Sequence, residues 1–185
     1  MRRGIIVVAG VPGAGKTTLG RLLARAWGLA FLRLSSLVLE HGAWSRYDPA
    51  GRGFVIDVEG VCGVLRGYVE RLGGFVLETH WPGVVSECGL SGLVRGVVAV
   101  RCRPGVLSAR LRRRGWRCGK LVENVEAEAL GVVAREAYEL AVGAGAWFYE
   151  AVTCVEGCGG LCYEFREGCC VEFVDEVSML GAMSC

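Results

Sequence analysis

The sequence predicts an α/β fold of three layers, in which a parallel five-stranded core sheet lies between two layers of helices. Short apolar segments rich in β-branched residues are typical of parallel strands that are buried on both faces. Amphipathic segments with helical spacing alternate with them. The length of 185 residues suits one domain. We therefore treat 1–185 as a single domain, with an insertion at 35–56, a lid at 110–120 and a Cys-rich C-terminal extension at 154–185.

The first expected strand, residues 4–9, leads into a glycine-rich loop and then a helix over 18–27. Residues 10–18 fit the pattern G-x-x-x-x-G-K-[ST] at every required position. The alternative is a glycine-rich turn that contains Lys-Thr by chance, and the order strand, loop, helix disfavours it. The sequence therefore predicts a phosphate-binding loop, or P-loop, within the P-loop NTPase fold.

The chemistry of a P-loop requires these residue types. Glycines let the backbone approach a polyphosphate closely, so that successive N–H groups and the helix N-terminus face the anion. Lys16 adds a charge toward the β- and γ-phosphates, and the Thr17 hydroxyl is placed to bind Mg²⁺. We expect ATP and Mg²⁺ as cofactors, with the nucleotide phosphates bound by Gly13, Ala14, Gly15, Lys16, Thr17 and Thr18.

The next elements follow from apolar runs and their boundaries. Residues 29–34 predict a second strand, and Ser35 and Ser36 predict the N-cap of a short helix over 37–40. Residues 41–54 predict a mobile insertion. A helix from Asp57 to about residue 72 has acidic residues in its first turn, which suit the positive end of its dipole.

The second half continues the alternation. Residues 75–77 predict a strand that ends in Glu78, Thr79 and His80. The remaining expectations are a strand at 97–100, a helix over 106–114, one long amphipathic helix over 120–142 and a last core strand at 147–153. Extra hairpin-like strands are expected in the Cys-rich remainder, including 171–174.

Composition bounds the function. A net charge of +2 does not indicate a nucleic-acid-binding surface, so no direct nucleic-acid binding is expected, although arginines cluster between 101 and 117. The apolar run after Met1 resembles a secretory signal, but it leads straight into the P-loop and is interpreted as the first core strand. No stretch approaches the ~20 apolar residues that span a membrane, so we expect a soluble, cytoplasmic protein.

The amides and cysteines suggest a thermophile. The chain has one asparagine and no glutamine, and the depletion of thermolabile amides fits a hyperthermophile. Ten cysteines would then be compatible with intracellular disulfides. Disulfides are favoured for the C-terminal cysteines, with a zinc site as the alternative, because no histidine and no two clean pairs accompany them. These cysteines are Cys154, Cys158, Cys162, Cys169 and Cys170.

A P-loop alone does not separate kinases, GTPases and motor ATPases. A single domain with two short insertions and no guanine-reading N-K-x-D segment favours a small nucleoside monophosphate kinase. In that class the acceptor binds beneath the insertion after the second strand, and a lid that carries arginines closes over the donor.

Four segments resemble, in order, the adenylate kinase 6 family. Residues 110–116 match its R-L-x-x-R-G-[WY], and residues 120–128 match a Lys followed by E-N-x-x-x-E. Residues 47–48 with 55–59 resemble its acceptor-side segment, and residues 78–80 resemble its D-x-H, with Glu78 in place of Asp. The likeness covers roughly residues 4–141.

The resemblance implies an adenylate kinase that uses AMP as acceptor, has ATPase activity and assists maturation of the small ribosomal subunit by binding a ribosomal protein. It implies catalytic roles for Lys16, for His80 near the reacting phosphates, and for Arg110 and Arg114 in the lid against phosphate and adenine. Thr17 and Glu78 would hold the metal. Such residues supply what phosphoryl transfer needs, namely alignment, charge neutralisation and exclusion of water.

Simpler roles stay open for several residues. Arg112 and Arg113 suit a solvated helix face. His80 suits a satisfied strand end, and Asp57 and Glu59 suit plain helix-start charges. Lys120 suits an ion pair with Glu123 on its own helix.

Two other functions also stay open. One is an ATP-gated assembly factor that binds a ribosomal protein and has incidental kinase activity. The other is a kinase of another small acceptor, because the insertion offers no arginine clamp besides Arg46 and Arg52.

Overall fold

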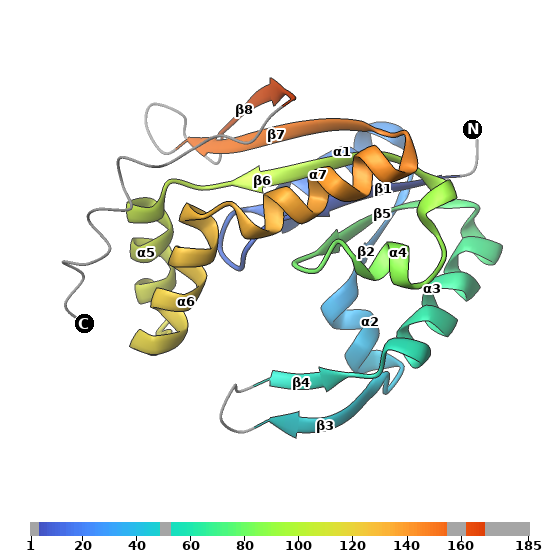
Figure 1. The fold of residues 1–185 in the computed structure, drawn as a ribbon, viewed down its shortest axis with the longest axis horizontal. Coiled ribbons are helices and arrows are strands. Elements are labelled where there is room, and N and C mark those ends of the chain that lie inside the picture. The colour runs from blue at the N-terminus through green and yellow to red at the C-terminus, as the bar shows by residue number, and fades with distance from the viewer. Residues whose placement is uncertain (1–3, 49–52, 155–161, 169–185) are drawn as a thin grey trace.

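A computed structural model describes residues 4–48, 53–154 and 162–168. Its main sheet has six strands in the order β2-β5-β1-β6-β7-β8, with helices on both faces (Figure 1). The first five strands run parallel and β8 runs antiparallel to β7, so the predicted parallel five-stranded core is confirmed. The strands are β1 (Gly4–Ala9), β2 (Ala30–Arg33), β5 (Gly74–Thr79), β6 (Val94–Arg101), β7 (Trp147–Cys154) and β8 (Cys162–Glu167).

Each face of the sheet has its own core, because successive side chains of a strand point to opposite faces. In β1, Ile5 and Val7 belong to one buried cluster, and Ile6 and Val8 belong to the other. The first cluster contains residues of α2 (Leu34–Glu40), α3 (Val58–Leu72), α4 (Val84–Glu87) and α7 (Val132–Ala144). The second contains residues of α1 (Lys16–Trp27), α5 (Pro104–Arg113) and α6 (Cys118–Ala129). A 3₁₀ turn, η1 (Ser91–Leu93), precedes β6.

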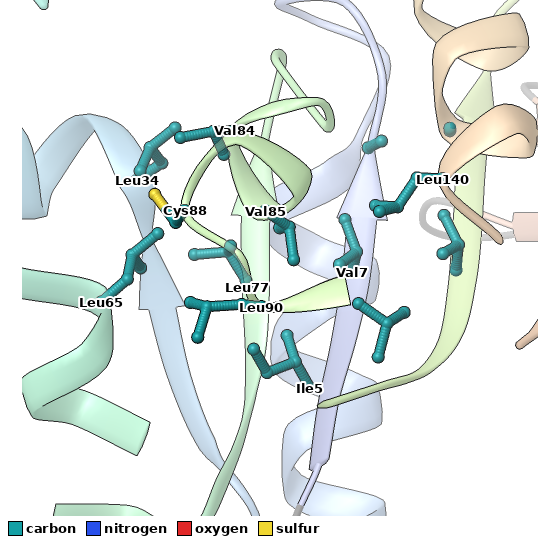
Figure 2. Close-up of a cluster of buried hydrophobic side chains, with 14 of the residues drawn as sticks. Ile5, Val7, Leu34, Leu65, Leu77, Val84, Val85, Cys88, Leu90 and Leu140 are labelled. Atoms are coloured by element: carbon teal, nitrogen blue, oxygen red, sulfur yellow. The ribbon is translucent and has the colours of Figure 1, made fainter. Parts of the chain in front are cut away.

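Figure 2 shows the first cluster, in which Leu34, Leu65 and Leu77 gather around the short helix α4. A disulfide between Cys62 and Cys88 joins α3 to the end of α4 beside this cluster. The sequence favours disulfides for the C-terminal cysteines and does not indicate this one, since two cysteines 26 positions apart carry no recognisable spacing signal.

The single helix expected over 120–142 is wrong, because two helices occupy this stretch. α6 ends at Ala129, and α7 begins at Val132 after Gly131, whose φ of 65° lies in the left-handed region. A Cβ on Gly131 would meet the Arg101 guanidinium at 3.7 Å. The chain turns there around a buried arginine, which an apolar stripe does not reveal.

The insertion also differs from expectation. In the described part of 41–54, β3 (Trp44–Asp48) pairs with β4 (Gly53–Ile56) as an antiparallel two-stranded sheet, which lies apart from the main sheet in Figure 1. The ring of Phe54 packs against Trp44 and Tyr47, with centroids 4.8 and 5.4 Å apart. Two paired strands, which the sequence did not predict, therefore occupy the described part of this segment.

The predicted serine N-cap is wrong as well. α2 begins at Leu34, so Ser35 and Ser36 lie inside the helix, and Arg33 occupies the N-cap position without a side-chain capping bond. Tertiary packing of Leu34, which is 1% exposed, overrides the local preference of serine for a helix start.

The C-terminal expectations are tested only in part. β8 confirms an extra hairpin-like strand, whereas 171–174, Cys158, Cys169 and Cys170 lie outside the described residues. Among the helices of the described part of the chain, none is both long enough and apolar enough to cross a membrane.

Candidate active site

The P-loop connects β1 to α1 at the carboxyl edge of the parallel strands, which is where α/β folds bind ligands. Gly10, Gly13 and Gly15 have φ values of 151°, 91° and 111°, which side chains with a Cβ rarely adopt. A Cβ on Gly10 would also lie 2.5 Å from the Val100 carbonyl oxygen. The loop conformation thus depends on glycine at these positions, and α1 starts directly at Lys16.

A cavity of about 390 Å³ opens above the loop. Most of the predicted site residues line it, although Ala14 of the loop is fully buried and does not. The residues that line it and were not predicted include Arg33, the last residue of β2, and Ser35 in α2, which the position at the carboxyl end of that strand would have indicated. The full lining is Pro12, Gly13, Gly15, Lys16, Thr17, Thr18, Arg33, Ser35, Glu78, Thr79, His80, Arg110, Arg114 and Trp116.

Thr17 and Glu78 meet across the cavity floor. The Thr17 hydroxyl lies 2.9 and 3.0 Å from the two carboxylate oxygens of Glu78 and donates to that carboxylate. Arg33 Nε forms an ion pair with the same carboxylate at 3.1 Å. A hydroxyl and a carboxylate are hard oxygen ligands of the kind that Mg²⁺ takes beside nucleotide phosphates, so the donor set fits this ion.

Lys16 is buried at the start of α1, and its Nζ donates to the Val11 carbonyl oxygen at 3.0 Å. Burial lowers the pKa of Lys16 to about 8, and the negative charge of Glu78 opposes that shift. The ammonium group therefore rests on the P-loop backbone, next to the cavity that it lines.

His80 follows the last residue of β5 and reaches the same cavity. Removal of water by the cavity walls lowers the pKa of His80, and the positive charge of Lys16 lowers it further. The imidazole is therefore neutral at pH 7 and has one nitrogen that accepts a hydrogen bond.

The arginines at the C-terminal end of α5, with Arg114 at the C-cap position, divide into two groups. Arg110 and Arg114 line the cavity, together with Trp116, whereas Arg112 and Arg113 are exposed and do not line it. Arg110 Nη1 lies 3.3 and 3.5 Å from the carbonyl oxygens of Gly13 and Ala14 and donates toward them. Arg110 thus touches the P-loop backbone from its lid helix.

Three other charged residues that the sequence analysis singled out do not line the cavity. Lys120 forms the expected exposed ion pair with Glu123 at 2.8 Å, and its positive charge also contributes to the lowered pKa of His80. Asp57 and Glu59 stand exposed at the start of α3, outside the cavity lining.

One arginine of the cluster noticed in the sequence is structural. Arg101 is 1% exposed and pairs with Glu128 at 2.8 Å and Glu150 at 3.1 Å. The Glu128 carboxylate also accepts a hydrogen bond from the Cys102 backbone amide. Sequence reasoning missed this buried group, since a charged residue at the end of an apolar strand gives no sign of distant carboxylates.

Comparisons with known proteins show the family and the fold of the chain. Residues 6–131 match the family described as "AAA domain". The chain belongs to the AAA-domain family. Relatives that carry the name "Putative adenylate kinase" include a Sulfurisphaera tokodaii protein, 36% identical over 73% of this chain and 68% of its own length. A Methanothermobacter thermautotrophicus protein of the same name is 38% identical over 74% of each chain.

The fold of this AAA-domain chain also occurs in solved structures. A shikimate kinase from Acinetobacter baumannii, in complex with shikimate, superposes with a TM-score of 0.52 at 21% identity over 85% of each chain. That likeness concerns the fold alone. The family match ends at residue 131, so the β7–β8 hairpin at one edge of the sheet lies beyond it.

Proposed function

We propose that this protein is an adenylate kinase that converts ATP and AMP into two molecules of ADP. The observation that carries the proposal is the convergence of Lys16, the Thr17–Glu78 pair and Arg114 on one cavity above the P-loop. The name carried by the archaeal relatives supports the choice of adenylate as substrate.

In the proposed reaction, the P-loop amides and Lys16 bind the β- and γ-phosphates of ATP. Thr17 and Glu78 would hold Mg²⁺, which would neutralise charge on the phosphate oxygens. Arg114, which lines the cavity from the end of the lid helix, adds positive charge where the transferred phosphoryl group becomes more negative.

The acceptor side of the cavity is proposed to include Arg33. Its guanidinium already pairs with Glu78, so an incoming AMP phosphate would compete for it from the same edge of the sheet. Arg46 is exposed on β3 and does not line the cavity, and Arg52 lies outside the described residues. Arg33 is therefore the better candidate for the acceptor phosphate.

We extend the proposal to a basal ATPase activity in the cytoplasm. The lowered pKa of His80 favours the neutral imidazole, whose free nitrogen can accept a hydrogen bond from a water and orient it toward the phosphates when AMP is absent. The ribosomal-protein partner rests on the motif resemblance of residues 110–128.

The test of the kinase proposal is ADP formation from ATP and AMP in a coupled assay. Lys16→Ala should abolish it, whereas Arg25→Ala should leave it unchanged, because Arg25 is exposed in the last turn of α1 and does not line the cavity. Turnover of ATP that does not respond to AMP would contradict the kinase proposal and leave an ATPase.

The partner has a separate test. Immobilised protein is incubated with purified small-subunit ribosomal proteins, with and without ATP. Retention of one protein that depends on nucleotide supports the assembly role, and the absence of any retention contradicts it.

A further inference from the structure

The β7–β8 hairpin packs directly against the P-loop from behind. Tyr163, on β8, donates its hydroxyl hydrogen to the Gly15 carbonyl oxygen at 2.9 Å. Thr153 faces Tyr163 in the register of the two strands. A Cβ added to Gly15 would lie 3.0 Å from Thr153 Cγ2 and 3.3 Å from the Tyr163 hydroxyl. Both side chains thus contact the same residue of the loop, although β8 lies outside the family match.

The Gly15 carbonyl has a special place in the loop. Gly15 is the N-cap of α1, and its carbonyl oxygen also accepts the amides of Thr18 and Leu19 at 3.2 and 3.3 Å. The peptide that joins Gly15 to Lys16 is planar and trans, so its N–H points opposite to its C=O. A carbonyl held toward the helix and Tyr163 therefore holds the Lys16 amide hydrogen in the direction of the helix N-terminus, where a phosphate binds.

Arg110 does the same for the two preceding peptides. Its Nη1 lies within hydrogen-bond distance of the Gly13 and Ala14 carbonyl oxygens, and the Thr153 hydroxyl accepts from it at 3.2 Å. Thr153 in turn donates to the Arg101 carbonyl oxygen at 3.2 Å. Three successive P-loop carbonyls thus lie within hydrogen-bond distance of side chains outside the loop, two of them near Arg110 and one near Tyr163.

The phenol is suited to this contact. Burial raises the pKa of Tyr163, while hydrogen bonds with Thr18 and Leu19 lower it. The hydroxyl keeps its proton over the whole neutral range, so it remains a donor to the carbonyl.

We propose that Tyr163 is a positioning residue for the P-loop, whose hydroxyl orients the Gly15–Lys16 peptide so that the Lys16 amide meets the phosphates of a nucleoside triphosphate. This inference rests on the proposed function for the identity of the nucleotide, ATP. It assigns a role in nucleotide binding to the β7–β8 hairpin, in addition to its position at the edge of the sheet.

The test compares Tyr163→Phe with Tyr149→Phe. The first variant keeps the ring and removes the hydroxyl that contacts the loop. The second removes a hydroxyl from β7 of the same hairpin, where Tyr149 faces Glu167 rather than the P-loop. ATP binding is measured by calorimetric titration with Mg²⁺, and ADP formation is measured at varied ATP and at varied AMP.

We expect Tyr163→Phe to weaken ATP binding by about 3- to 10-fold, the range for loss of one hydrogen bond. The KM for ATP should rise by a similar factor while the KM for AMP stays unchanged. Tyr149→Phe should bind ATP as the unaltered protein does. Equal ATP affinity in all three proteins overturns the inference, and so does an equal loss in both variants.

The outcome separates this inference from the proposed function. If the unaltered protein binds ATP but makes no ADP from AMP, the kinase proposal fails, while the binding titrations still decide the role of Tyr163. If Tyr163→Phe loses ATP affinity and unfolds at the same denaturant concentration as Tyr149→Phe, the loss is local to the P-loop and supports the inference. If Tyr163→Phe instead unfolds at a lower denaturant concentration than Tyr149→Phe, and the lost stability is large enough to explain the weaker ATP binding, the inference is contradicted.

Discussion

The Thr17 hydroxyl donates to the carboxylate of Glu78, 2.9 and 3.0 Å from its two oxygens, and so links the first turn of α1 to the end of β5. The two residues are 61 positions apart, and parallel pairing of β1 with β5 brings them together. The longer side chain of glutamate, compared with aspartate, spans this gap from the strand to the helix.

Glu78→Gln should reduce Mg²⁺ affinity by about 10- to 100-fold, because the amide keeps the size of the side chain but loses the charge that attracts the cation. ADP formation measured over a range of Mg²⁺ concentrations should therefore shift to higher metal. Glu87→Gln, an exposed change on α4 outside the cavity lining, is the control and should not shift the curve. A curve for Glu78→Gln that superposes on the control would exclude a metal role.

ATP affinity should fall as the pH rises above about 8, the pKa of buried Lys16. Only the charged ammonium group attracts phosphate. Above this pKa, the affinity for ATP should therefore decline by up to about tenfold per pH unit. Titrations with ATP at pH 7 to 9.5 measure it. An affinity that stays constant across this range would show that Lys16 remains charged.

Stability should move in the opposite direction in the same pH window. The folded pKa of Lys16, about 8, lies below the ordinary value of 10.5. The unfolded chain therefore binds more protons between these two pH values, and the free energy of unfolding rises with pH there. Denaturant unfolding should show this rise for the unaltered protein and a flatter profile for Lys16→Met.

Arg101→Met should lower the free energy of unfolding by about 3–5 kcal/mol, because it leaves the buried carboxylates of Glu128 and Glu150 without their cation. Denaturant unfolding at pH 7 measures the loss. Arg166→Met is the control, since its ion pair with Glu164 is exposed and should contribute no more than about 1 kcal/mol. Losses of similar size in both variants would contradict the importance of burial.

Two glycine substitutions should have opposite signs. Gly131→Ala should cost about 1–2 kcal/mol, because φ at this position is 65°. Gly143→Ala should instead stabilise by about 0.5–1 kcal/mol, since Gly143 lies inside α7 with open space where the added methyl group would lie. Thermal or denaturant unfolding compares them, and a Gly131→Ala variant as stable as the unaltered protein would mean that the α6–α7 break does not depend on the left-handed φ of Gly131.

Replacement of Cys62 and Cys88 by alanine should lower the free energy of unfolding by about 3 kcal/mol, as expected when a bridge across 26 residues no longer restricts the unfolded chain. Unfolding is measured without reductant, so that Cys118 keeps its own disulfide. The single variant Cys62→Ala should lose at least as much, because it leaves the Cys88 thiol unbridged. A double variant as stable as the unaltered protein would contradict a stabilising bridge.

Local patterns predicted the core strands and the P-loop because their determinants lie within a few residues. An apolar β-branched run such as 4–9 requires burial on both faces, and a loop that must fold around phosphate requires its glycines. The motif also predicted Lys16 and Thr17 at the cavity, where the structure places them.

Local patterns failed where a distant residue decided the outcome. The apolar stripe of 120–142 continues through Gly131, but the buried side chain of Arg101 occupies the turn. Likewise Ser35 and Ser36 resemble a helix start, whereas packing of Leu34 makes the helix begin at Leu34, nearer the N-terminus.

The sequence by itself determined a parallel α/β fold with a P-loop, because periodicity and glycine spacing act over short stretches of chain. Only the tertiary structure decided that Glu78 reaches Thr17, that Arg110 and Tyr163 hold the P-loop carbonyls, and that Cys62 meets Cys88. These contacts join residues between 26 and 148 positions apart, and their geometry exists only once the strands have paired and the helices have packed on them.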